Sequence, residues 1–332
     1  MASIIATAPG RCGIVGNPSD MYGGSVISCT TMERAECHLE TGGTNIRLWN
    51  ADECATLETM DDLALRGDKL DIARAALWYF DLDPQKTHLS LRLRTDIPMR
   101  AGLAGSTALL ATLVGALSAY INRSASLYHV AETTRKIEAR VMNIVCGLQD
   151  QHMTVFGGLN FMDFQGKEQL EQRDTEPLAT VEPLANHVPA PPLLLAHTGI
   201  QHHSGRVHSS PRQRWLDGEP LVRHNYSEIA HLARAGKRAL LEQDWCALGK
   251  LMNENHRLVA ELGGSGRAND KLIRTARDGG AWGAKLAGAG GGGTILVLTD
   301  NPERVGGALL AAGAECLLTP RPQPGLTVIR DG

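Results

Sequence analysis

The clearest alternation of apolar and polar residues lies at positions 87–95, where THLSLRLRT places an apolar side chain at every second position. This period of two predicts a half-buried strand. Residues 108–120 are almost wholly apolar and predict a buried helix. A glycine-containing segment, 98–109 (PMRAGLAGSTAL), joins the two. The order strand, glycine loop, helix directs free backbone N–H groups at the helix N-terminus toward an anion.

Similar patterns predict the other elements. Strands are expected at 3–8, 26–29, 35–39, 157–164, 191–198, on both sides of the glycines in 281–298, and near 326–330. Helices are expected at 63–80, 124–145, 221–241, 245–262, 270–278 and near 302–312. Segment 166–192 is polar and contains proline, so we place a domain boundary near its end and expect domains at 1–190 and 191–332. Helices mix with antiparallel-looking strands without strict alternation, which favours an α+β fold.

Composition narrows the class of protein. A chain of 332 residues exceeds the usual size of a single core, which agrees with two domains. The net charge is −3 and like charges form no block, so we expect neither nucleic acid nor a membrane as a partner. The seven cysteines show no CxxC pair, no signal peptide is evident, and no run of 18 apolar residues occurs. We therefore expect a cytoplasmic protein with reduced thiols, and no pattern indicates its oligomeric state.

Three glycine-rich segments, far apart in the chain, are suited to holding phosphate or anionic oxygen against the backbone. They are 8–25 (APGRCGIVGNPSDMYGGS), 98–109 and 285–294 (KLAGAGGGGT). None contains the GxxxxGK[ST] pattern of a P-loop, and none has the strand–GxGxxG–helix context of a dinucleotide-binding fold. The sequence therefore predicts an anion or nucleotide site assembled from distant pieces.

Glu138 is the first candidate for a metal ligand. If residues 126–145 form one helix, Glu138 lies inside the apolar stripe while neighbouring charges, among them Arg135, point away from it. An unpaired buried carboxylate costs several kcal/mol, so Glu138 requires a cation. That cation is either a divalent metal ion or an arginine from elsewhere in the chain.

Three further residues have both a structural and a catalytic interpretation. Asp150 follows a glycine turn and is either a helix N-cap or the acceptor of a substrate hydroxyl proton. Ser106 and Thr107 begin the apolar helix and either cap it or ligate Mg²⁺. Arg11 is either a surface arginine or a fixed charge close to a transferred phosphoryl group.

Residues 202–215 (HHSGRVHSSPRQRW) are expected to form a loop rich in histidine and arginine. The histidines match no zinc spacing. The loop is either mobile and solvated, or it binds an anionic substrate through Arg206, Arg212 or Arg214, because a guanidinium pairs with a carboxylate in a bidentate manner.

Together, the three glycine-rich segments resemble the three motifs of the GHMP kinase superfamily in order, spacing and position. The resemblance implies an N-terminal domain like the second domain of ribosomal protein S5 and a ferredoxin-like C-terminal domain. It also implies ATP and Mg²⁺ as cofactors, Asp150 and Arg11 as catalytic residues, and Ser106 and Glu138 as metal ligands. The ATP-binding residues it implies are Gly102, Leu103, Ala104, Gly105, Ser106 and Thr107.

Within this superfamily the chain is more similar to the glucuronokinase family, through GNPSD (16–20), GLQD (147–150), FGGLNFMDF (156–164) and SGRVHSSPRQRWLDG (204–218). Galactokinases carry Glu-His-Thr-Asp where this chain has Asn-Pro-Ser-Asp. The resemblance implies phosphorylation of D-glucuronate at its anomeric hydroxyl, with another sugar (galacturonate, arabinose or a heptose phosphate) or a non-catalytic sugar-binding regulator as alternatives. The substrate-binding residues it implies are Asn17, Ser19, Asp20, Arg206, Arg212, Arg214, Gly290 and Gly291.

Overall fold

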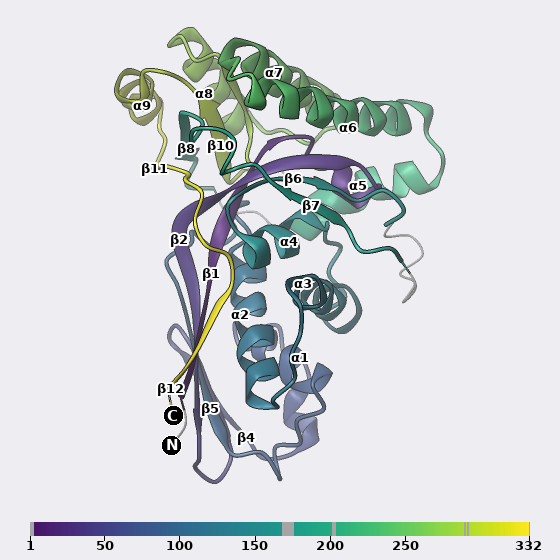
Figure 1. Ribbon diagram of the computed structural model, residues 1–332, viewed down its shortest axis with the longest axis vertical. Helices are drawn as coiled ribbons and strands as arrows, with labels where there is room; N and C mark the ends of the chain where they lie inside the picture. The colour runs from purple at the N-terminus through teal and green to yellow at the C-terminus, as the bar shows by residue number, and fades with distance from the viewer. Residues whose placement is uncertain (1–2, 168–175, 201–203, 289, 291, 332) are drawn as a thin grey trace.

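The structure, a computed structural model, describes residues 3–167, 176–200, 204–288, 290 and 292–331, and the side chains of 204–209 lie outside this description. Within these ranges the first sheet has eight strands in the order β12-β1-β2-β5-β3-β4, with β6 on β2 and β7 on β6 (Figure 1). All pairs are antiparallel except β3 with β5. The strands are β1 (Ser3–Val15), β2 (Ser25–Thr41), β3 (Ile46–Asn50), β4 (Glu53–Leu57), β5 (Leu89–Thr95), β6 (Leu159–Asp163), β7 (Thr180–Pro183) and β12 (Thr327–Asp331).

Four helices lie on one side of this sheet (Figure 1). They are α1 (Asp71–Tyr79), α2 (Gly105–Tyr120), α3 (Leu127–Lys136) and α4 (Gln149–Phe156). Helix α2 is the central one, and its leucines at 109, 110, 113 and 117 are at most 1% exposed. Burying a leucine contributes roughly 1.5–3 kcal/mol, so α2 is anchored firmly and its N-terminus is held at a fixed place.

The second sheet has the order β11-β8-β10-β9 and is antiparallel throughout. Its strands are β8 (Leu193–His197), β9 (Gly283–Leu286), β10 (Thr294–Leu298) and β11 (Cys316–Leu318). Helices α8 (Arg267–Asp278) and α9 (Pro302–Ala311) pack on it through Leu272, Ile273, Val305 and Leu309. This split βαβ arrangement confirms the expected ferredoxin-like part and the α+β class.

Three helices lie in sequence between β8 and α8, namely α5 (Ser204–Leu216), α6 (Pro220–Leu241) and α7 (Trp245–Glu261). One cluster of buried side chains continues from the first sheet through α6 and α7 to Leu296 and Leu298 of β10. The two parts therefore share a hydrophobic core. The boundary near residue 190 stays a prediction, but β12 adds to the first sheet beside β1, which places the last strand with the first part of the chain.

The structure corrects several expected elements. Residues 204–216 form helix α5, with Pro211 inside it, where a loop was expected. Where one helix was expected at 124–145, the α-helix α3 ends at Lys136. One π-helical segment, Ile137–Val141, follows it, and no helix continues beyond Val141 as far as α4. Arg135, expected to point away from the apolar stripe, is nevertheless buried and pairs with Glu176. The two expected strands 26–29 and 35–39 are one strand, β2, while β3, β4, β7 and β11 were not predicted.

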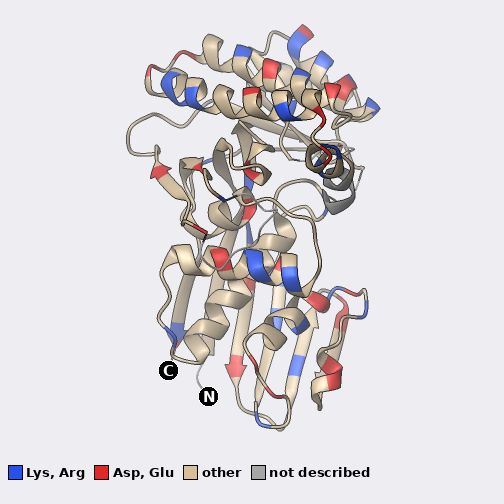
Figure 2. Ribbon diagram, turned by 90° about the vertical axis from the view of Figure 1, so that its right-hand side faces the viewer, with Lys and Arg blue, Asp and Glu red and all other residues tan. Residues whose placement is uncertain are grey.

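Lysine and arginine alternate with aspartate and glutamate along the helices in the upper part of Figure 2. Among the described residues no helix is both long and apolar enough to cross a membrane. All seven cysteines are free thiols.

Candidate active site

Arg11 and Asp150 form an ion pair at the junction of the first and second glycine-rich segments. Nε of Arg11 donates to Asp150 Oδ1 at 2.8 Å, and Nη2 lies 2.6 Å from the same oxygen. Nη1 donates to the carbonyl of Gly102 at 2.6 Å. The Arg11 side chain is 6% exposed and that of Asp150 is 28% exposed. Arg11 is therefore not a surface arginine but is fixed between two segments that lie 91 residues apart.

Asp150 stands in the first turn of α4, but it does not cap this helix. The N-cap is Leu148, and the capping oxygen is Oδ2 of Asp20, which accepts from the N–H groups of Leu148 at 2.7 Å and Gln149 at 3.0 Å. Burial raises the pKa of Asp20, and the two N–H donors act in the opposite direction. The capping interpretation of Asp150 is thereby removed, and Oδ2 of Asp150 has no partner in the described part of the chain.

The second glycine-rich segment presents an anion-binding backbone. Arg100, Gly102 and Ala104 all have positive φ angles, of 57°, 75° and 62°, and Ala104 is the N-cap of α2. No described acceptor takes a hydrogen bond from the backbone N–H groups of residues 102–107. Free N–H groups at a helix N-terminus favour negative charge. The expected ATP-phosphate residues 102–107 therefore form one open cradle of donors.

Glu138 is buried, as the apolar pattern predicted, but it lies in the π-helical segment. Such segments occur often at functional sites. Its Oε1 accepts from Thr107 Oγ1 at 2.7 Å, and its Oε2 accepts from the Gln151 amide. Within the described ranges no lysine or arginine lies within ion-pair distance of it. Burial raises the pKa of Glu138 to about 7, against the opposing effect of these hydrogen bonds.

These residues fit a Mg²⁺ ion held jointly by protein and substrate. Mg²⁺ prefers one or two carboxylates together with phosphate oxygens and water, rather than a complete protein cage. Glu138 supplies a carboxylate without a described cation, and the exposed hydroxyl of Ser106 lies one residue from its partner Thr107. No group of three or more His, Cys, Asp or Glu side chains suited to a metal occurs in the described part of the molecule.

The third glycine-rich segment packs against the other two. Gly13 N donates to Ala287 O at 3.0 Å. At Gly288 a Cβ atom would lie 2.6 Å from Gly102 O, so only glycine fits there. Gly290, expected to bind substrate, has φ +93° and lies against Gly264 O. Gly291 lies outside the described residues.

The expected substrate contacts of the first segment are buried and already bonded. Asn17 is 3% exposed and its Oδ1 accepts from Lys285, while Ser19 is 1% exposed and its Oγ donates to Ser25 O. Asp20 Oδ1 has no described hydrogen bond, so this oxygen is the one open to a ligand.

The arginines of α5 differ from one another. Arg214 pairs in a bidentate manner with Glu219, at 2.7 and 2.6 Å. Arg212 is half-buried and has no described hydrogen-bond or ion-pair partner. Burial raises the pKa of Tyr22, and the charge of Arg212 opposes this rise, which places Arg212 near the first segment. The side chain of Arg206 lies outside the described residues.

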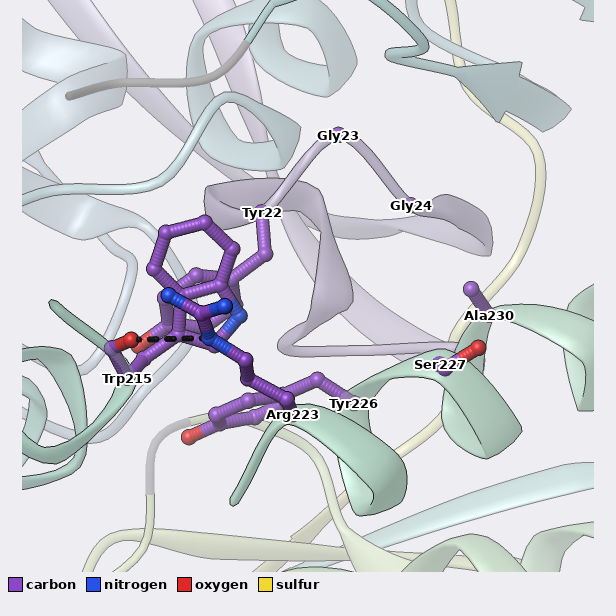
Figure 3. Close-up of a pocket in the computed structure, with 8 residues that line it drawn as sticks. All are labelled: Tyr22, Gly23, Gly24, Trp215, Arg223, Tyr226, Ser227 and Ala230. Atoms are coloured by element: carbon purple, nitrogen blue, oxygen red, sulfur yellow. Dashed lines mark hydrogen bonds between the residues drawn. The ribbon is translucent and has the colours of Figure 1, made fainter. Parts of the chain in front are cut away.

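Beside this place lies a pocket of about 330 Å³ between residues 22–24 and α6 (Figure 3). Tyr22 stacks on Tyr226, with ring centroids 4.2 Å apart, and on Trp215 at 5.2 Å. The guanidinium of Arg223 lies over the Trp215 ring, 5.1 Å from its centroid. Aromatic stacking thus attaches α5 to the first glycine-rich segment.

Two polar residues that contact the site, Lys285 and Asn255, were not predicted. Both are at most 1% exposed, and both bind the turn that follows β1. Asn255 lies on the buried face of α7 with Leu248, Met252 and Val259. The reasoning that selected Glu138, a polar residue within an apolar stripe, applies to Asn255 as well.

Comparison with known proteins agrees with this geometry. The family models described as GHMP kinases N terminal domain and GHMP kinases C terminal match residues 71–158 and 237–316. Probable glucuronokinase 2 of Arabidopsis thaliana is 31% identical over 89% of this chain and 84% of its own length. D-glycero-alpha-D-manno-heptose 7-phosphate kinase of Campylobacter jejuni is 27% identical over 90% of each chain.

Among solved structures, Lactococcus lactis galactokinase complexed with galactose superposes with a TM-score of 0.77 at 15% identity, covering 98% of this chain and 95% of that one. Fold and site define a small-molecule kinase built from two α+β parts. The chain belongs to the GHMP kinase family.

Proposed function

We propose that this protein is an ATP- and Mg²⁺-dependent sugar 1-kinase that converts D-glucuronate to its 1-phosphate. The observation that supports it most is the Arg11–Asp150 pair, in which Arg11 also binds Gly102 O, because a carboxylate next to the free N–H groups of residues 102–107 suits phosphoryl transfer. The uronate assignment is supported by glucuronokinase relatives that align over most of the chain.

In the proposed reaction the anomeric oxygen of the sugar forms a bond to the γ-phosphorus of ATP as the bond to the β-bridging oxygen breaks. ADP leaves, and the hydroxyl proton passes to Oδ2 of Asp150, the oxygen that Arg11 does not bind. Phosphoryl transfer depends mainly on positioning and charge neutralisation, so this step requires chiefly that the Asp150 carboxylate lies next to the hydroxyl.

The cradle and the metal ligands serve the nucleotide. The N–H groups of residues 102–107 bind phosphate oxygens, and Glu138 with Ser106 would hold Mg²⁺. When bound, the ion neutralises phosphate charge and orients the transferring group. Because Thr107 and Gln151 already bind the Glu138 carboxylate, its position is fixed in advance.

The carboxylate of the sugar requires a cation that is not already paired. Of the two α5 arginines with described side chains, Arg214 is bound to Glu219 while Arg212 has no described partner. We therefore assign the uronate carboxylate to Arg212.

The test is turnover of a panel of sugars with ATP, by wild-type protein and by Asp150→Asn. Glucuronate is expected to be the best acceptor. Asp150→Asn should lower kcat by about 10²–10⁴-fold, because it removes the proton acceptor, while ATP affinity stays nearly unchanged. Asp270→Asn, in the first turn of α8, is the matched control and should retain wild-type kcat.

Three outcomes would contradict parts of this proposal. A parallel loss of ATP binding in Asp150→Asn would indicate a structural role for the carboxylate. Equal or better turnover of a neutral sugar or a heptose phosphate would reject the uronate. ATP binding without ADP formation for any sugar would indicate a sugar-binding regulator.

A further inference from the structure

Lys285 is a buried cation at the start of the third glycine-rich segment, 285–294, and no role is assigned to it from the sequence or in the proposed reaction. Its side chain lies at the end of β9 and is 1% exposed. Nζ donates to Leu286 O at 2.6 Å, to Asn17 Oδ1 at 2.7 Å and to Gly13 O at 3.2 Å. No carboxylate of the described residues lies within ion-pair distance. Three neutral oxygens thus account for all three donors of the ammonium group.

Asn17 lies in the turn between β1 and the 3₁₀ segment Ser19–Met21, and Gly13 lies near the end of β1 itself, 272 residues from Lys285. Residues 13–20, the end of β1 and this turn, are called the turn below. Burial lowers the pKa of Lys285 to about 7, and the nearby charge of Arg11 acts in the same direction. A cation is disfavoured in such a place unless its hydrogen bonds are all made. The three acceptors therefore have to remain where they are.

A second side chain from the later part of the chain holds the same turn. Oδ1 of Asn255 accepts from Gly16 N at 2.9 Å, and its Nδ2 donates to Asn17 O at 3.0 Å. Asn255 is fully buried in α7. Lys285 and Asn255 thus fix residues 13–17 from two different elements.

The turn leads directly to the catalytic pair. Three residues beyond Asn17 is Asp20, whose carboxylate caps α4 at Leu148 and Gln149, and Asp150 is the next residue. Two residues before Gly13 is Arg11, the partner of Asp150. The turn therefore connects the two members of the pair, and its conformation sets where both of them lie.

We propose that Lys285 is a positioning residue for phosphoryl transfer, which locks the turn 13–20 and through Asp20 fixes the first turn of α4, so that Asp150 is held on Arg11. It acts through the turn and does not touch the reacting atoms. The effect on turnover rests on the proposed function, whereas the effect on the turn itself does not.

The first experiment compares Lys285→Met with Lys271→Met. Lys271 is an exposed lysine of α8 that also donates to a backbone carbonyl, that of Ala312, far from the turn. Lys285→Met is expected to lower kcat about 10²-fold with the KM for ATP changed less than about twofold, since small misplacements of reacting groups have effects of that size. Lys271→Met should match wild type in both constants.

The second experiment needs no sugar. Amide hydrogen exchange of Leu148 and Gln149, the donors to Asp20, should become at least about tenfold faster in Lys285→Met, while amides of α9 keep their wild-type rates. If Lys285→Met does not fold, Asn255→Ala replaces it, with the same expected change at the same two amides.

The two experiments distinguish a failure of the positioning role of Lys285 from a failure of the proposed sugar kinase function. Unchanged protection of Leu148 and Gln149 in a folded variant overturns the positioning role, as does an even loss of protection throughout the chain. A wild-type protein that phosphorylates no uronate overturns the substrate assignment alone, and the exchange rates still test Lys285.

Discussion

At the scale of single residues, polar side chains fall into two groups. Those with a hydrogen-bond or ion-pair partner in the described part of the protein are structural, and those without one are open to a ligand. Asn17, Ser19 and Arg214 resemble substrate-binding residues in sequence, yet each is engaged inside the protein. Oδ2 of Asp150 and the guanidinium of Arg212 have no described partner. These two groups are therefore the ones whose substitution should affect substrate selectively.

Replacing Arg212 by alanine should raise the KM for glucuronate about 10–100-fold, because a hydrogen bond between charged groups contributes about 1.5–3 kcal/mol. The KM for a neutral sugar should change little. Arg214→Ala is the matched control, since it breaks a partly exposed ion pair with Glu219, which water screens and which contributes little to stability. Steady-state kinetics with both sugars checks this. A rise of equal size for both sugars would show that Arg212 does not bind the carboxylate.

The sequence predicted the burial of Glu138, because it follows from local periodicity. The catalytic role of Asp150 stays a prediction. The sequence did not predict that Asn17 and Arg214 are engaged, since their partners lie elsewhere in the fold or beyond a helix that the pattern did not indicate. The Asn17–Lys285 contact joins residues 268 positions apart, and no local pattern signals it.

At the scale of elements, the start of α4 is the critical feature. Its cap is the carboxylate of Asp20, which comes from 128 residues earlier in the chain. Gly147 makes room for this carboxylate, because a Cβ atom there would lie 2.1 Å from Asp20 Oδ2. Gly147, three residues before Asp150, is thus required for packing.

Gly147→Ala should therefore displace Asp20 from α4 and lower kcat strongly, with a loss of stability of about 1–3 kcal/mol because two buried donors lose their acceptor. Gly307→Ala in α9 is the control, since nothing lies within 4 Å of its added Cβ and alanine favours a helix. Activity and urea unfolding of both variants check this. Wild-type kcat in Gly147→Ala would show that the cap is not needed.

Most helices and three strands of the second sheet, β8, β9 and β10, followed from hydrophobic periodicity. The exception that matters for the proposed function is α5, which contains Arg212 and was expected to be a loop. Its sequence contains serine, histidine and an internal Pro211, which all lower helix propensity. Tertiary packing of Trp215 on Tyr22 opposes that preference.

At the scale of the whole molecule, stability should depend on pH through His152 of α4. Burial lowers the pKa of His152 to about 4, and the charge of Glu132 opposes this shift while those of Lys167 and Arg135 increase it. The unfolded chain binds a proton near pH 6.5, so between pH 6.5 and 4 it carries more protons than the folded state. Stability is thus fully present above pH 6.5 and is lost as the pH falls.

This loss amounts to about 3 kcal/mol for His152 at pH 4 or below. His152→Asn keeps a donor for the Leu148 carbonyl and should flatten the dependence of the unfolding free energy on pH between 6.5 and 4. His231→Asn, at a histidine that is 61% exposed, should leave that dependence unchanged. Urea unfolding at pH 7, 6 and 5 measures both. Equal slopes for wild type and His152→Asn would show that another group is responsible.

The pairing of β12 with β1 has a consequence for biosynthesis. Ser3 lies opposite Asp331, so the outer edge of β1 lacks this partner until residues 327–331 have left the ribosome (Figure 1). At 5–20 residues per second, this edge waits roughly 10–30 s after β7 has been made. During that interval Ile4 and Ile5 belong to an open strand edge, the kind of surface that nascent chains expose to chaperones or to one another. Protection of the first strand therefore waits until residues from both parts of the chain have been made.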